Sequence, residues 1–326
     1  MKTLNWMLRR EIWEHKGSLF WAPVIVAAIL LFFTAASAGY GMLAHGGAVE
    51  AVVNGRQVHI TDFRGMPPPM REAVVQVAGN SYLAAAGPLF IMLAFTLFFY
   101  CLSALYDERR DRSVLFWKSL PMSDQMTVLS KVLTAAVVAP VITMAAALVM
   151  SLALLVVAGA YLAFNGVNLF GALLATPALY LAPVLLLGML PVYILWALPT
   201  IGWLLMVSSW AKSKVFLWAI GVPLIALVIV KWVDFLVTGN QGMNTGLTYV
   251  AKEAVNRGLG GLVPGIWFAF SDHTVRMRPG EHGIELATVF QQSWMTLAAP
   301  GVWIGAAVGV AMIFVAIRMR RWRDEG

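Results

Sequence analysis

Residues 82 to 106 read YLAAAGPLFIMLAFTLFFYCLSALY, a run of 25 residues that contains no charged side chain. An α-helix of about 20 apolar residues is long enough to cross the hydrocarbon core of a bilayer. Apolar runs of spanning length recur along the chain, at residues 19–43, 126–163, 172–210, 214–238 and 296–317. The sequence therefore predicts an all-α integral membrane protein with six transmembrane helices, in a single domain over residues 1–326.

The composition excludes most other classes of protein. Of the 326 residues, 60% are apolar and 12% are charged, whereas soluble domains have roughly 45–50% and about 25%. The chain is therefore too apolar for a soluble globular protein or a disordered segment. Its single cysteine, Cys101, excludes an internal disulfide and a cysteine-rich zinc site.

The run at residues 172–210 is the hardest to interpret. A continuous helix of this length would measure about 58 Å, nearly twice the roughly 30 Å hydrocarbon core. Prolines interrupt it at four positions, Pro177, Pro183, Pro191 and Pro199. Because proline removes a backbone donor and bends a helix, we expect one kinked span whose first part lies outside the core.

The formal net charge of +7 lies on one side of the membrane. With the amino terminus inside, 15 of the 23 basic residues and 8 of the 16 acidic residues fall in predicted cytoplasmic segments, so the whole excess is internal. This distribution obeys the positive-inside rule. It predicts a multi-pass protein of the bacterial inner (plasma) membrane, with both termini cytoplasmic. Topology and contact with anionic membrane lipid explain the basic balance, so we expect no nucleic-acid partner.

The first 18 residues predict an amphipathic helix in the inner membrane interface. Leu4, Leu8 and Ile12 recur at helical spacing, and Trp6 and Trp13 are typical interfacial residues. A simple cytoplasmic extension of the first span is the alternative. A cleavable signal peptide is disfavoured, because the apolar run is too long and acidic residues interrupt the basic region.

The segment between the second and third spans carries large apolar residues inside a charged helix. Residues 107–120 begin DERRDR and continue through Val114, Leu115, Phe116 and Trp117 to Leu120-Pro121. Ser123 then predicts the N-cap of a new helix, with Asp124 at the positive end of its dipole. Charges that only set topology need no aromatic patch. We therefore expect Phe116 and Trp117 to insert in the inner leaflet or to be buried by a partner protein.

This arrangement resembles the permease subunits of type-2 ATP-binding-cassette (ABC) exporters. In that family an acidic-basic helix follows the second span, and then come an apolar patch, Leu-x-x-x-Pro-x-Ser and a lysine. The matching residues here are Glu108, Arg109, Ser113, Leu115, Leu120, Pro121, Ser123 and Lys131. Ser113 stands where many members have glycine, and Trp117 stands at a position that is often polar. These departures concern the surface that would contact a partner.

The resemblance implies that residues 107–120 form a coupling helix docked on a separate ABC ATPase subunit, present in two copies. The implied docking contacts are Glu108, Arg109, Arg112, Leu115, Phe116 and Trp117. A second permease, as a homodimer or a related chain, would complete the complex. These 326 residues contain no G-x-x-x-x-G-K-[ST] motif, so we expect no enzyme and no cofactor in this chain, and ATP and Mg bound by the partner ATPase. The alternative is that these charges only fix topology.

The external segments, residues 44–81 and 239–295, are expected to carry short elements. Asn54-Gly55 predicts a hairpin turn, residues 245–257 an amphipathic helix, and residues 259–270 a re-entrant or interfacial piece. The resemblance implies that external helices before the last span help to close the exit. Four of the five histidines lie in these segments, in loop-like sequence that favours solvated side chains over a metal site.

The apolar parts of the spans predict the nature of the transport pathway. They show no paired acid and no ion ligand, which disfavours a proton- or sodium-coupled carrier. The residues expected to face a hydrophobic or amphipathic compound are Phe95, Phe99, Tyr100 and Phe216. Packing between helices or contact with lipid is the alternative for these aromatics. A membrane scaffold or mechanical transmitter, which couples a cytoplasmic ATPase to a periplasmic partner without transport, is the alternative function.

Overall fold

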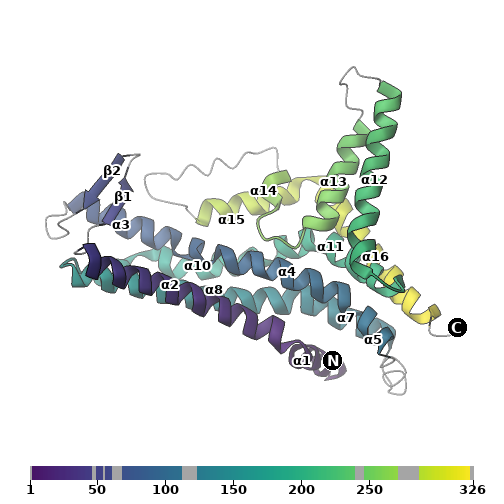
Figure 1. Ribbon diagram of the computed structural model, residues 1–326, viewed down its shortest axis with the longest axis horizontal. Coiled ribbons are helices and arrows are strands. Elements are labelled where there is room, and N and C mark those ends of the chain that lie inside the picture. The colour runs from purple at the N-terminus through teal and green to yellow at the C-terminus, as the bar shows by residue number, and fades with distance from the viewer. Residues whose placement is uncertain are drawn as a thin grey trace.

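The computed structural model of the chain describes residues 2–45, 49–53, 56–60, 68–111, 123–238, 246–270 and 286–323 (Figure 1). Six helical segments in this part of the chain are long and apolar enough to cross a membrane. Their bounds are Gly17–Gly41, Arg71–Arg110, Asp124–Phe164, Pro177–Trp210, Val215–Val237 and Pro300–Arg321. The prediction of a mainly helical protein with six apolar helices of membrane-spanning length is therefore confirmed.

Most of the helices form an elongated bundle. Figure 1 shows four of them running along one another, α2 (Ala22–His45), α4 (Gly87–Ser103), α8 (Ala139–Phe164) and α10 (Pro177–Gly188). At one end lie α3 (Pro68–Ser81) and an antiparallel hairpin of β1 (Val49–Val53) and β2 (Arg56–Ile60), in which Val49 pairs with Ile60. At the other end lie α1 (Lys2–Glu14), α5 (Tyr106–Arg110) and α7 (Asp124–Leu133). The predicted hairpin is present, although its turn residues lie outside the described residues.

Prolines explain two irregular turns in these helices. A π-helical turn, Gly17–Trp21, joins α1 to α2, and a second one, Thr134–Val138, joins α7 to α8. Pro23 and Pro140 follow them and cannot donate the backbone hydrogen bond to residues 19 and 136. Widening the turn accommodates each missing bond without ending the helix. The predicted N-cap of α7 is also present, because Ser123 Oγ accepts a hydrogen bond from Met126 N at 3.3 Å.

The fourth predicted span is divided at a proline-rich junction. A short helix, α9 (Phe170–Ala175), comes first, and α10 then ends before Met189, where α11 (Leu190–Trp210) begins. Pro177 and Pro191 lie in the first turns of α10 and α11, where a missing N–H costs little. The segment that qualifies as a span begins at Pro177, so α9 is a helix separate from it.

The closest helix pair in the bundle is α11 with α16 (Pro300–Arg323). Gly202 and Gly309 lie at their crossing, and a Cβ atom on Gly202 would overlap with the carbonyl oxygen of Gly309. A Cβ atom on Gly309 would lie 2.6 Å from the carbonyl oxygen of Leu198. Small residues allow such close backbone contact, which is a common means of helix association in membranes.

A pair of helices projects from the side of the bundle. Figure 1 shows α12 (Val215–Thr238) and α13 (Gly246–Gly260) running together away from the other helices. The base of α13 is fixed by Arg257, whose guanidinium lies 4.8 Å from the ring centroid of Trp196 in α11 and 6.0 Å from that of Phe270. Helix α13 corresponds to the amphipathic helix predicted at residues 245–257. Residues 261–266 are turns that lead to α14 (Trp267–Phe270), and α15 (Leu286–Met295) precedes α16.

Candidate functional site

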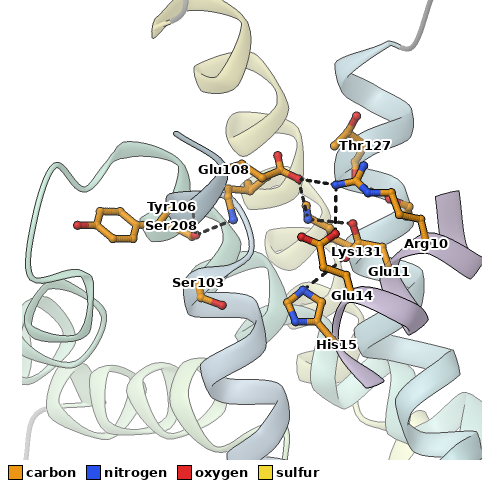
Figure 2. A network of polar contacts seen from close by, with 12 residues as sticks. Arg10, Glu11, Glu14, His15, Ser103, Tyr106, Glu108, Thr127, Lys131 and Ser208 are labelled. Carbon is orange, nitrogen blue, oxygen red and sulfur yellow. Dashed lines mark hydrogen bonds and ion pairs between the residues drawn. The ribbon is translucent and has the colours of Figure 1, made fainter. Parts of the chain in front are cut away.

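Charged side chains from four elements meet inside the protein at the end of the bundle where α1, α5 and α7 lie. They are Glu11 of α1, Glu108 of α5, Lys131 of α7 and Arg320 of α16, and all four are at most 8% exposed. Figure 2 shows the side chains of α1, α5 and α7 pointing toward one another. We call Glu11, Glu108, Lys131 and Arg320 the charge cluster.

Lys131 lies at the centre of the charge cluster. Its Nζ donates a hydrogen bond to Glu11 Oε1 at 3.0 Å and forms an ion pair with Glu108 Oε1 at 3.0 Å. Arg320 Nη1 donates to the other oxygen of Glu108 at 2.6 Å, and Arg320 Nε donates to Asp124 Oδ1 at 3.2 Å. One continuous chain of ion pairs therefore joins α1, α5, α7 and α16.

Neighbouring side chains complete the surroundings of Glu11 and Glu108. The hydroxyl of Tyr100 donates to Glu11 Oε2 at 2.9 Å, and Arg10 Nη2 lies 3.8 Å from Glu108 Oε1. The ring of His15 meets that of Tyr100 edge to face, with the centroids 4.9 Å apart. Burial lowers the pKa of His15, so this imidazole is neutral at pH 7.

The charges inside the cluster balance. Among the buried groups, the carboxylates of Glu11 and Glu108 face the cations of Lys131 and Arg320. At the margin, Asp124 pairs with Arg320, and Arg10 lies between Glu108, at 3.8 Å, and the half-exposed Glu14, at 3.2 Å. A balanced buried network contributes little net stability compared with apolar side chains of the same size, but removing one member leaves an uncompensated charge. Such a network therefore favours one relative arrangement of the four elements.

A second set of contacts attaches α5 to the end of α11. Arg109 Nη2 donates to the backbone oxygens of Ser208 and Ala211, at 2.6 and 3.0 Å. The hydroxyl oxygen of Ser208 accepts from the backbone N–H groups of Leu105 and Tyr106, at 3.1 and 3.0 Å. Helix α5 is thus held on one side by ion pairs and on the other by hydrogen bonds to α11.

The structure accounts for two of the six residues expected to dock an ATPase. Glu108 and Arg109 both make contacts inside the chain, which gives them a structural role that the sequence did not predict. Arg112, Leu115, Phe116 and Trp117 lie outside the described residues, as does most of the predicted coupling helix. Docking on an ATPase thus stays a prediction for the whole set.

Sequence reasoning missed the buried partners of Glu108. Glu11 was interpreted as an interruption of a basic region and Arg320 as a charge that sets topology. Lys131 was interpreted as a charge that sets topology and as the lysine of the family resemblance. Met7 and Glu11, not Leu4, Leu8 and Ile12, are the most buried residues of α1. The signal was Lys131, a charge that lies seven residues past the start of a helix of spanning length. A lysine at such a position needs a carboxylate partner.

An open groove of about 910 Å³ runs along the outer face of α4. Phe95, Phe99 and Tyr100, three of the four residues expected in the transport pathway, line it. The fourth, Phe216 of α12, lies beside it and meets the ring of Phe98 with the centroids 6.2 Å apart. Phe95 and Phe99 are exposed, whereas Tyr100 is buried and reaches the charge cluster through its hydroxyl. The groove and the charge cluster therefore adjoin at Tyr100.

A second, smaller cavity of about 300 Å³ lies at the amino-terminal end of α4. Its apolar walls include Phe90, Met144, Tyr193 and Trp267. Phe90 and Pro88 are close in sequence, but Phe90 lines this cavity and Pro88 lines the groove. Helix α4 therefore separates two apolar hollows on different faces.

The charge cluster and the groove offer ion pairs and apolar contacts to other groups. Within the described ranges, no group of three or more His, Cys, Asp or Glu side chains is placed to hold a metal ion. Cys101 is buried, so its thiol is shielded from solvent. The site can fix the relative positions of helices and can adjoin an apolar molecule in the groove.

The chain was compared with known protein families, curated proteins and solved structures. No protein-family model, no curated protein and no solved structure matches the chain.

Proposed function

We propose that this chain is the membrane-spanning permease subunit of an ABC exporter, which moves a hydrophobic or amphipathic compound with ATP hydrolysed by a separate subunit. The observation that carries the proposal is the position of α5. This helix leads into the segment that resembles a coupling helix, and buried ion pairs join it to α1, α7 and α16. A force on that segment would therefore reach several spans at once.

The proposed mechanism uses the charge cluster as a rigid connection. ATP binding would bring two ATPase subunits together and displace the coupling segments of two permeases. Glu108 would transmit this displacement to Lys131 and Arg320, and Arg109 would transmit it to the end of α11. Packed interfaces of this kind change between discrete arrangements rather than deforming gradually, so the spans would alternate between two states.

The proposal includes an orientation and a location. The charge cluster would lie at the cytoplasmic side of a bacterial plasma membrane, together with both termini, as the positive-inside distribution favours. Phe95, Phe99, Tyr100 and Phe216 would contact the transported compound along α4 and α12. A homodimer would supply the two permease halves.

Replacement of the apolar patch tests the docking step. Phe116→Ala with Trp117→Ala should abolish co-purification of the ATPase and its stimulation by the permease, with the unfolding temperature of the chain unchanged. This pair is a cleaner test than any change at Arg109, which binds α11. Trp13→Ala is the matched control, because Trp13 is an aromatic on α1 that is 61% exposed. Unchanged co-purification and stimulation in the double variant would refute the docking assignment.

A mechanical transmitter without transport activity is the second candidate. The extent of structure outside the predicted spans favours it, because α3, the hairpin and α13 to α15 could receive a periplasmic partner. Reconstituted vesicles separate the two candidates. Compound movement that depends on ATP supports the exporter, whereas hydrolysis without movement of any lipid or amphiphile tested supports the transmitter.

A further inference from the structure

The groove along α4 carries a positive charge at one end and none at the other. Lys214 lines the end near α1, together with His15, Ser18 and Ser103. The opposite end is formed by Pro88 and Ile91. Among the described residues that line the groove there is no Asp or Glu. The groove is therefore complementary to an amphiphile that has an acidic head and an apolar chain.

Lys214 is held at this end by an unusual backbone conformation. Its φ is 51°, the only positive φ of a non-glycine residue in the described part of the chain. Left-handed backbone of this kind is strained for a residue with a side chain, and such strain clusters at binding sites. The side chain is exposed, and the structure shows no ion pair for it with any described residue.

The other nitrogen base at this end does not add charge. His15 faces Glu11, Tyr100 and Lys131, and burial lowers its pKa below the usual range. Lys214 is therefore the cation available to a molecule in the groove at pH 7. The hydroxyls of Ser18 and Ser103 each donate to the backbone oxygen three residues earlier, which leaves their oxygens able to accept.

We propose that the groove binds an anionic amphiphile from the inner leaflet, with its acidic head on Lys214 and its acyl chain along Ile91, Phe95 and Phe99. The lining of the groove extends from Pro88 to Tyr106, about 27 Å along the helix axis, and the part from Ile91 to Ser103, where the acyl chain and the head would lie, measures about 18 Å. The hydrocarbon depth of one leaflet is about 15 Å, half of the roughly 30 Å core. One acyl chain and its head thus match the length and polarity of this part of the groove.

A second copy of the chain fits the groove less well. In a symmetric dimer contact the same surface of each protomer lies on its partner, so that surface would have to supply the acidic group that meets Lys214. The described residues that line the groove include no Asp or Glu, so the groove of a second copy offers Lys214 no anion. The role of the bound amphiphile as transport substrate rests on the proposed function, but its binding to the purified chain does not.

The test measures binding of a fluorescent single-chain phosphate monoester lipid to the purified chain in neutral detergent. Lys214→Asn removes the charge and keeps a residue that tolerates positive φ. It should weaken binding about five-fold, and a probe with the same chain and a zwitterionic head should change less than two-fold. Lys212→Asn is the matched control, because Lys212 is exposed two residues away and does not line the groove. It should leave both affinities within two-fold.

The apolar part of the groove is tested separately. Ile91→Trp should weaken both probes, whereas Val149→Trp, at an exposed position of α8 away from the groove, should weaken neither. An unchanged affinity in Lys214→Asn would overturn the proposal. So would displacement of the probe by inorganic phosphate, which would indicate a free-anion site, or a change of oligomeric state in Ile91→Trp, which would indicate an interface between copies. If the chain binds the probe but no ATPase associates with it, the exporter is refuted and the site stands. If an ATPase associates but Lys214→Asn does not weaken probe binding, only the site is refuted.

Discussion

Replacing Lys131 with methionine is the sharpest perturbation of the charge cluster. Lys131 Nζ is 3.0 Å from one oxygen of Glu11 and 3.0 Å from one oxygen of Glu108. Glu108 keeps Arg320 at 2.6 Å, but Glu11 keeps only the Tyr100 hydroxyl and a neutral imidazole. Glu11 is 1% exposed, so its carboxylate would be buried without a cation.

The expected cost is about 3–5 kcal/mol, the usual penalty for removing one partner of a buried ion pair. That is a large part of a total stability of roughly 5–15 kcal/mol. The assay is unfolding by sodium dodecyl sulfate in mixed micelles, followed by tryptophan fluorescence. Lys131→Arg, which keeps the charge, and Lys212→Met, at an exposed position, are the controls.

Second-site changes make the reasoning specific. Glu11→Gln in the Lys131→Met background removes the orphaned charge and should restore more than half of the lost stability. Glu108→Gln in the same background should restore little, because it takes from Arg320 the partner 2.6 Å away. A cost below about 1 kcal/mol for Lys131→Met, or equal rescue by both second changes, would refute this account of the cluster.

Further predictions concern helix packing, pH and the attachment of α13. Gly309→Ala should destabilise the chain by about 1–3 kcal/mol in the same unfolding assay, because the new Cβ would meet backbone, whereas Gly221→Ala, where the structure leaves open space, should be neutral or stabilising. His15 has a lowered pKa, so the unfolded chain binds a proton that the folded chain resists, and stability should fall as pH drops below about 6.5; His15→Gln should flatten this dependence of the unfolding midpoint. Arg257→Gln removes the cation from the face of Trp196 and should speed limited proteolysis within α13 at unchanged global stability; equal cleavage rates would contradict this role.

The predictable part of the fold was set by composition and by local signals. Apolar runs fixed the six spans, and Ser123 marked the start of α7 as expected. Both features depend on neighbouring residues along the chain, which sequence patterns report directly. The break between α10 and α11 was expected only as a kink, because four prolines in one run do not show which of them divides the helix.

The candidate site was less predictable because its partners are far apart in sequence. Glu108 and Arg320 are 212 residues apart, and Lys131 and Glu11 are 120 apart. A charge near a membrane end has two interpretations, as a topology signal or as a buried partner, and only the packing of α1, α7 and α16 separates them. The interpretation of Tyr100 as a pathway residue was incomplete for the same reason, because its hydroxyl reaches Glu11 while its ring borders the groove.

The sequence also gave no sign that α11 and α16 would be the most closely packed pair. Their contact depends on the alignment of Gly202 with Gly309, which is a property of the assembled bundle. The projection of α12 and α13 from the bundle was equally unexpected, since both have ordinary helical sequences.

The central claim is that α5 transmits ATPase movement to the spans through Glu108. The most direct measurement is ATP hydrolysis by the complex purified with the tagged chain, compared between wild type, Glu108→Gln and Glu14→Gln. Glu14 is the control because it lies on the same side of the protein but its side chain is 50% exposed and its ion pair, at 3.2 Å, is with Arg10 and not with Lys131 or Arg320. The account predicts that the Glu108→Gln chain still binds an ABC ATPase, but that its stimulation of ATP hydrolysis is at least ten-fold lower than that of the wild type. Glu14→Gln should stimulate ATP hydrolysis as much as the wild type does. A wild-type chain without an ABC ATPase, or full stimulation in Glu108→Gln, would contradict it.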